Sequence, residues 1–185
     1  TKINNFSFED FLEKSTVFHG KPSPGVLIGA FLVEQAKKYF PDKTRFHVIV
    51  ETPKSLPDAV QLLTPCTIGN GGLKLVNLGR YALSFYDIIN GKGVRVYLDS
   101  KKLEKWPEIK GWLFKLTPAK EHDMEKLVSE IQKAGSKICS MVSIKVHDRF
   151  LTGQALGKIC VCSGCGEAYP ESDGGICRGC MNETP

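Results

Sequence analysis

The sequence predicts an α+β protein with a largely antiparallel sheet flanked by helices, followed by a small cysteine-rich module. Three observations lead to this fold class. Stretches rich in β-branched and apolar residues cluster in the middle of the chain, between Arg45 and Asp99. Segments with helical periodicity lie on both sides of them. Five of the seven cysteines crowd into the segment from Cys160 to Cys180.

Two helices are predicted before the strands. Ser7 and Asp10 have the spacing of a capping box, which predicts a short helix directly after Ser7. The segment Gly25–Phe40 is apolar on nearly all sides in its first half, which predicts a buried helix with its N-terminus at Pro24. The two glycines of this segment permit close approach of another backbone.

The central strands follow these helices. Arg45–Thr52 is predicted to be a strand, and Pro57 suits the first turn of a short helix that runs through Leu63. Three further strands are expected within Leu73–Asp99, and the glycine-containing turn Asn90–Gly93 joins the last two as a hairpin.

The end of the larger domain is predicted to contain one more helix and one more strand. Thr117 and Pro118 are expected to open the helix, and Gly135 to close it. A strand from Ile138 to Val146 follows. The tryptophans before this helix are expected to anchor a short irregular segment to the core.

Composition excludes several classes of protein. The chain has 185 residues, of which 42% are hydrophobic and 24% charged, so it lacks the signature of intrinsic disorder. Its longest nearly uncharged apolar run, Val26–Val33, is far shorter than the roughly 20 residues that span a bilayer. With no secretory leader visible and an uneven distribution of cysteines, we expect a cytoplasmic protein without membrane contact.

The hydrophobic periodicity of the sequence ends after Phe150, and the following residues are mostly Gly, Cys and polar residues. We therefore expect two domains, residues 1–150 and 151–185. The formal net charge is +5, but the segment from Lys158 onward is net acidic. The positive excess therefore lies in the larger domain.

The strongest chemical signal is a pair of C-x-x-C motifs separated by eleven residues. Two such turns can present four sulfurs to one tetrahedral ion, which predicts a structural four-cysteine zinc ribbon; iron is compatible with the same cage. The predicted ligands are Cys162, Cys165, Cys177 and Cys180. Cys160 is too close to Cys162 in sequence to form a metal-binding turn with it, so Cys160 is not among the predicted ligands. Four thiolates outweigh the charge of Zn²⁺, so docking to a protein, or a purely structural role in holding domains together, is favoured over contact with nucleic acid.

Three further segments, His19–Gly25, Glu51–Gln61 and Pro65–Leu73, together with the double C-x-x-C tail, resemble in order and spacing the motifs of the E-subunit family of formylmethanofuran dehydrogenase. The likeness covers nearly the whole chain. It implies association with a molybdenum- or tungsten-dependent one-carbon oxidoreductase, in an accessory or ligand-binding role. It also implies a homodimer.

The first family motif is HGHxCPG, and this chain departs from it at two positions. Lys21 stands in place of the second histidine and Ser23 in place of the cysteine, while Ser55 stands where a cysteine is common in the second motif. The resemblance places histidine and cysteine ligands around the start of the helix at Pro24. Of these ligands, the chain retains His19 and Cys66. We therefore expect these two residues to face one cavity that holds a transition metal weakly, unless Cys66 is a core residue and His19 a turn residue.

Two other function classes stay open at this point. One is a stand-alone enzyme that uses Cys66 and His19 on a small substrate. The other is a zinc-ribbon regulator that binds a protein or a nucleic acid. A reactive thiol at Cys66 distinguishes the enzyme from an accessory protein. Salt-dependent retention on a polyanion identifies the regulator that binds nucleic acid.

Overall fold

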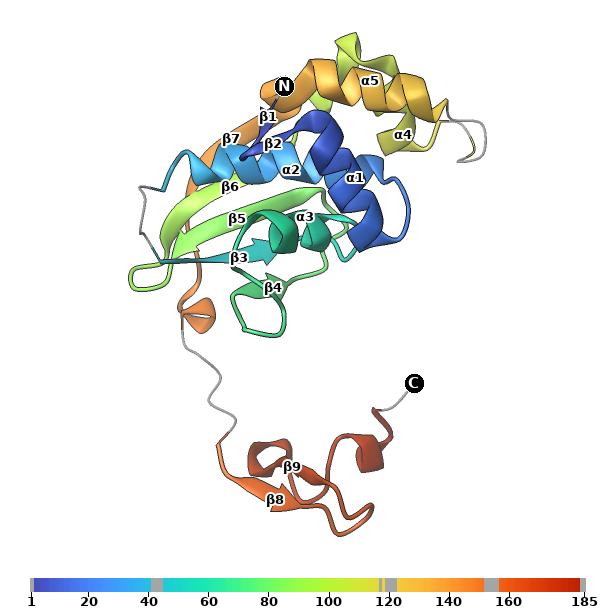
Figure 1. Cartoon of the computed structure of the whole chain (residues 1–185). Coiled ribbons are helices and arrows are strands. Elements are labelled where there is room, and N and C mark those ends of the chain that lie inside the picture. The colour runs from blue at the N-terminus through green and yellow to red at the C-terminus, as the bar shows by residue number, and fades with distance from the viewer. Residues whose placement is uncertain (1, 41–44, 117, 119–122, 152–156, 184–185) are drawn as a thin grey trace. The chain divides into compact units, whose positions relative to one another are not determined.

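The computed structural model describes residues 2–40, 45–116, 118, 123–151 and 157–183. It divides the chain into two units, Thr1–Leu151 and Thr152–Pro185, which are considered separately (Figure 1). The larger unit is a mixture of helices and strands with a five-stranded sheet, and the smaller one is built around a two-stranded sheet. The predicted fold class, α+β with an antiparallel-rich sheet and a four-cysteine module, is confirmed.

The five strands of the larger unit have the order β4-β3-β5-β6-β7. All neighbouring pairs are antiparallel except β3 and β4, which are parallel and are connected through the helix α3. A separate two-stranded sheet near the N-terminus was not expected from the sequence. The strands of this unit are β1 Lys2–Ile3, β2 Phe6–Ser7, β3 Phe46–Val50, β4 Leu73–Leu75, β5 Ala82–Asp87, β6 Lys92–Leu98 and β7 Cys139–Lys145.

The first two helices begin where their capping residues predict. In α1 (Phe8–His19) the Ser7 hydroxyl accepts from the Asp10 backbone N–H, and the Asp10 carboxylate accepts from the Ser7 N–H, which completes the capping box. In α2 (Pro24–Lys37) Ser23 is the cap and Pro24 occupies the first turn. No helix in the described part of the chain combines the length and apolarity needed to cross a membrane.

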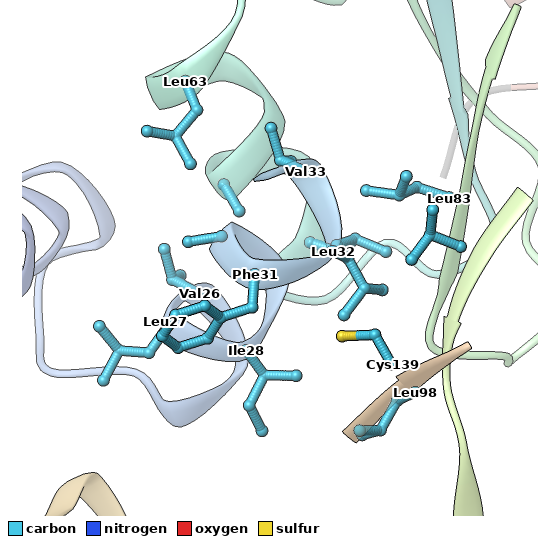
Figure 2. Close-up of a cluster of buried hydrophobic side chains, with 14 of the residues drawn as sticks. Val26, Leu27, Ile28, Phe31, Leu32, Val33, Leu63, Leu83, Leu98 and Cys139 are labelled. Atoms are coloured by element: carbon cyan, nitrogen blue, oxygen red, sulfur yellow. The ribbon is translucent and has the colours of Figure 1, made fainter. Parts of the chain in front are cut away.

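Helix α2 fills the centre of the larger unit. Its buried side chains pack against α3 (Leu56–Leu63) and against one face of the sheet. Figure 2 shows this contact, in which Leu32 of α2 faces Leu83, Leu98 and Cys139 of the strands. A helix that is apolar on nearly all sides is stable only in such an enclosed position, which explains why α2 is central.

Glycines allow α2 and α3 to approach closely. A Cβ added at Gly25 would lie 2.7 Å from the Ser55 Cβ, and one added at Gly29 would lie 2.8 Å from the Ala59 Cβ. Real side-chain atoms do not tolerate such distances, so any larger residue must push the two helices apart. The prediction that these glycines permit close backbone approach is confirmed, and α3 is the neighbour.

We expect Gly29→Ala to destabilise the larger unit by about 1–2 kcal/mol, because overpacking outweighs the helix propensity that alanine adds. Besides Ala59, the new methyl group would meet the Leu56 Cδ1 at 3.0 Å. Urea unfolding measures the change. The control is Gly69→Ala, whose Cβ would meet only the Thr67 hydroxyl, at 4.0 Å. An unchanged or raised stability of the Gly29 variant would contradict the close approach.

The opposite face of the sheet carries a second, smaller apolar cluster. Ile49, Tyr86 and Val146 are buried there and are packed against Phe150 and Leu151. The Tyr86 hydroxyl donates to the Phe150 carbonyl at 3.2 Å. The segment after β7 is therefore held against the sheet up to the end of the larger unit.

Two sequence expectations about this unit were wrong. Trp106 and Trp112 do pack against the core, but Trp112 lies in a regular helix, α4 (Pro107–Phe114), and not in an irregular segment, because Pro107 opens the helix as an N-terminal proline. Helix α5 (Met124–Ala134) begins later than expected: the Asp123 side chain caps it by accepting from the Lys126 N–H, and Pro118 lies outside the helix. Thr117, its other expected opening residue, is not among the described residues.

Candidate functional site

The smaller unit brings the two C-x-x-C motifs together. Strands β8 (Ile159–Val161) and β9 (Ala168–Pro170) pair antiparallel, and the first motif forms the turn between them. The sulfurs of all four cysteines lie within 4.8 Å of one another. The Cys162 and Cys180 sulfurs are 3.8 Å apart, and the Cys165 and Cys177 sulfurs 3.6 Å. A tetrahedron with Zn–S bonds of ~2.3 Å has edges of about 3.8 Å, so the arrangement fits zinc.

Backbone N–H groups surround these sulfurs. The Gly164 and Cys177 amides donate to the Cys162 sulfur, and the Cys180 amide donates to the Cys177 sulfur, each at 3.4 Å. Donation from the backbone N–H groups of Cys177, Cys165 and Gly164 lowers the pKa of Cys162 to about 6. A Cβ at Gly164 would lie 3.0 Å from the Cys180 sulfur, so this turn has little room for a side chain. Such donors orient the thiolates and stabilise their charge.

Cys160 lies next to this centre without joining it. It is half-buried in β8, opposite Tyr169 of β9. Among the described residues, the group of His, Cys, Asp and Glu side chains that could hold a metal ion consists of the four predicted cysteines. The chain therefore carries a structural zinc site in its smaller unit.

In the larger unit, His19 lines a cavity of about 710 Å³ between the end of α1, the starts of α2 and α3, and residues of α4 and α5. His19 is the last residue of α1, and its Nδ1 lies 2.5 Å from the Asp58 carboxylate in the first turn of α3. This contact leaves the Nε2 of the imidazole for other partners. We call this space the His19 cavity; it is lined by His19, Lys21, Pro22, Ser23, Pro24, Gly25, Pro53, Lys54, Ser55, Asp58, Trp112 and Met124.

Two serine hydroxyls meet in the His19 cavity. The Oγ atoms of Ser23 and Ser55 are 3.1 Å apart, and the Ser23 Oγ also accepts from the Val26 N–H. Ser55 has φ 59° and ψ −39°, in a tight turn closed by the Leu56 N–H donating to the Lys54 carbonyl. This backbone conformation is strained for a residue with a Cβ. The structure thus joins the two positions at which the resemblance places cysteines.

Sequence reasoning missed how the sheet and α4 support the His19 cavity. The Tyr81 hydroxyl donates to the Gly25 carbonyl at the start of α2, and its ring packs edge-to-face against Trp112 at 6.1 Å. Burial, followed by the negative charge of Asp58, raises the pKa of Tyr81, so the hydroxyl stays protonated as a donor. The Tyr81 contact depends on tertiary packing, and no local motif could have identified it.

Cys66 does not reach the His19 cavity, so the expected shared site was wrong. Cys66 lines a different cavity of about 270 Å³, and its thiol donates to the Phe46 carbonyl at 3.5 Å. His19 contacts the first turn of α3, whereas Cys66 follows the end of that helix, which spans ~12 Å. The second, weak metal site from these two residues is not formed. Burial raises the pKa of the Cys66 thiol, as is typical of a core cysteine and not of a nucleophile.

Glu51 from the second motif forms a buried ion-pair cluster instead of lining the cavity. Its side chain is 7% exposed, and its oxygens accept from Arg95 at 2.6 and 2.8 Å and from Arg80 at 2.7 Å. Burial by itself raises the pKa of Glu51, but the hydrogen bonds and charges of Arg95 and Arg80 outweigh it and hold the pKa below the ordinary value. The cluster joins the end of β3 to β6 and to the segment before β5.

Comparison with known proteins places these features in a family. The model of a family described as FmdE, molybdenum formylmethanofuran dehydrogenase operon, matches residues 18–146, and one described as FmdE treble clef zinc finger matches residues 154–185. A crystal structure of an FmdE-like protein of the tungsten formylmethanofuran dehydrogenase type, from Syntrophus aciditrophicus, shares 45% identity with a TM-score of 0.93. The match covers 100% of this chain and 97% of that one.

A more distant relative is a probable S-adenosyl-L-methionine-binding protein from Archaeoglobus fulgidus, 28% identical over 129 residues. That match covers 64% of this chain, which spans about a third of the relative's length, 35%. The four-cysteine module that the sequence predicts as a zinc ribbon matches a treble clef zinc finger, which is a different zinc-binding fold with the same number of ligands. The family match covers more than half of the chain, and the chain belongs to the FmdE family, with that family's treble clef zinc finger at its C-terminus.

Proposed function

We propose that the protein is an accessory, ligand-binding partner of a molybdenum- or tungsten-dependent oxidoreductase of the formylmethanofuran dehydrogenase type, in one-carbon metabolism. The descriptions of its family and of the crystal structure at 45% identity support this assignment. The observation that carries the ligand-binding role is the His19 cavity. Its polar side chains come from the family motifs, and its size lies within the range of small-molecule sites.

In this proposal the residues of the larger unit bind and orient a ligand and do not carry out redox chemistry. Asp58 fixes one nitrogen of His19, so that the other can hydrogen-bond a ligand. Cys66, the nucleophile of the enzyme alternative, lines another cavity and has a raised pKa. The accessory role is therefore favoured over a stand-alone enzyme built on His19 and Cys66.

The zinc finger has a structural role and contacts a protein partner in this proposal. Its four thiolates outweigh the charge of one Zn²⁺, and the acidic residues Glu167, Glu171 and Asp173 add to the negative charge. Such a surface opposes phosphate contacts, which disfavours a nucleic-acid regulator. A cytoplasmic location fits this proposal, because a reducing compartment keeps the thiols outside the centre free.

Metal analysis of a complex isolated from cells tests the proposed partner. The full-length protein is returned with an affinity tag to the organism that encodes it, and the purified material is assayed for molybdenum, tungsten and zinc. We expect molybdenum or tungsten to co-purify above the level found with the same tag on an unrelated protein. We expect less of either metal with Cys165→Ser, which disrupts the finger. Zinc alone, with neither metal above the control, would contradict the partner assignment.

We also propose a homodimer. A small zinc finger buries little apolar surface of its own and gains stability by packing against a second body, and two-fold dimers are the commonest closed assembly. Sedimentation equilibrium of the zinc-loaded protein at micromolar concentration is expected to give twice the chain mass of 20.4 kDa. A monomer at that concentration would count against the dimer.

A further inference from the structure

The His19 cavity carries an excess of positive charge. Lys21 and Lys54 both line it, and neither is paired with an acidic side chain in the described part of the chain. The acidic residue in the lining, Asp58, is already in contact with His19. Among the described residues, a ligand entering the cavity therefore meets two lysines without an acidic partner, and the carboxylate of the lining is already in contact with His19.

The hydroxyl pair also offers a hydrogen-bond donor. Each serine hydroxyl has one proton, and only one of the two protons can lie between the Ser23 and Ser55 oxygens. Whichever serine donates, the proton of the other stays free for an acceptor. The Ser23 oxygen also accepts from the Val26 N–H, and Ser23 as a residue is 7% exposed, so the hydroxyl pair is held in place. The polar groups of the cavity are thus mainly donors.

The remaining lining is apolar. Trp112 and Met124 form part of the wall, with three prolines that carry no backbone N–H. The Trp112 ring is held by its edge-to-face contact with Tyr81. A flat apolar group therefore finds a fixed aromatic surface next to the lysines.

The donor set does not suit a transition metal. His19 and Asp58 are already in contact with each other, and Met124 adds one thioether; the remaining polar groups of the cavity are hydroxyls and ammonium groups, which are poor ligands for soft or borderline ions. We propose that the His19 cavity binds an organic anion, a carboxylate or phosphate attached to a flat apolar body, at the positions where the family resemblance places metal ligands. This inference rests on the ligand-binding part of the proposed function.

Three naphthalene probes of matched size test the charge preference: 2-naphthoate, 2-naphthyl phosphate and the neutral 2-naphthamide. The readout is the NMR signal of the two tryptophan indole N–H groups in the zinc-loaded, full-length protein. Trp112 lines the His19 cavity, whereas Trp106 lines a separate depression and serves as the internal control. We expect an anionic probe to shift Trp112 selectively and to bind about tenfold tighter than the amide. A preference for naphthoate or for the phosphate identifies the anionic group.

The lysine variants separate the sources of the effect. Lys21→Met and Lys54→Met remove the charge and keep most of the length of the unbranched side chain, and together they are expected to abolish the preference for the anion. Lys101→Met, on another exposed segment, is the control and should leave it unchanged.

Equal binding of the amide and the anions at Trp112 would overturn the inference and leave the ligand-binding cavity intact. No shift of Trp112 with any probe would overturn both the anion preference and the ligand-binding role of the cavity. The molybdenum and tungsten assay tests the proposed partner and does not depend on either outcome.

Discussion

Replacing Cys165 by serine will release the zinc and unfold the C-terminal unit. The Cys165 sulfur is part of the four-sulfur group, and a unit of about 30 residues buries too little apolar surface to fold alone. Zinc binding contributes on the order of 10 kcal/mol to the folding of such modules, so we expect the loss of one ligand to outweigh every other stabilising contact of the finger. Zinc content and the amide NMR signals of residues 157–183 measure the outcome.

The matched control for this variant is Cys160→Ser. Cys160 lies two residues from Cys162 but outside the four-sulfur group, so its replacement should leave one zinc per chain and the finger folded. The larger unit should keep its spectrum in both variants, because its apolar core consists of its own residues. Full zinc occupancy in Cys165→Ser would contradict the ligand assignment.

Replacing Glu51 by glutamine should destabilise the larger unit by about 3 kcal/mol, because Arg95 and Arg80 then lose their carboxylate partner. The Glu51 side chain is 7% exposed and that of Arg95 22%, so water replaces little of the lost interaction; Arg80 is 59% exposed and contributes less. Thermal unfolding should show a fall in Tm of roughly 6–12 °C. Glu13→Gln, at an exposed carboxylate of α1, is the control and should be near neutral.

The same cluster makes stability depend on pH. The pKa of Glu51 is lower in the folded protein than in the unfolded chain, so the unfolded state takes up the proton first as the solution is acidified. Its contribution is present above the unfolded pKa, near 4.5, and is lost as the pH falls through the folded pKa. Unfolding free energies measured from pH 7 to 3 should therefore fall more steeply in the wild type than in Glu51→Gln. Parallel curves would show that Glu51 has no linked proton.

Features encoded by local signals were predicted correctly. The capping box at Ser7 and Asp10 and the proline at the start of α2 fix helix ends through neighbouring residues, so the sequence alone identifies them. The glycine-containing turn before β6 behaves in the same way, because only nearby residues set its conformation.

The His19 cavity required long-range information. His19 and Cys66 belong to separate motifs of the resemblance, and α3 lies between their positions and separates them by its own length. Conversely, Ser23 and Ser55 are 32 residues apart in sequence and meet because Gly25 lets α2 approach the start of α3. Contacts of this kind depend on helix packing, which neither periodicity nor motif spacing reports.

The central claim is that the protein has two separate sites: the four-cysteine centre binds zinc, and the cavity around His19 does not. X-ray absorption at the zinc edge of the purified, full-length protein tests it most directly, because the spectrum reports every ligand of every bound zinc. We predict a single shell of four sulfurs at ~2.3 Å, with about one zinc per chain. A contribution from nitrogen or oxygen ligands at ~2.0–2.1 Å, lost in a His19→Ala variant, would contradict the claim.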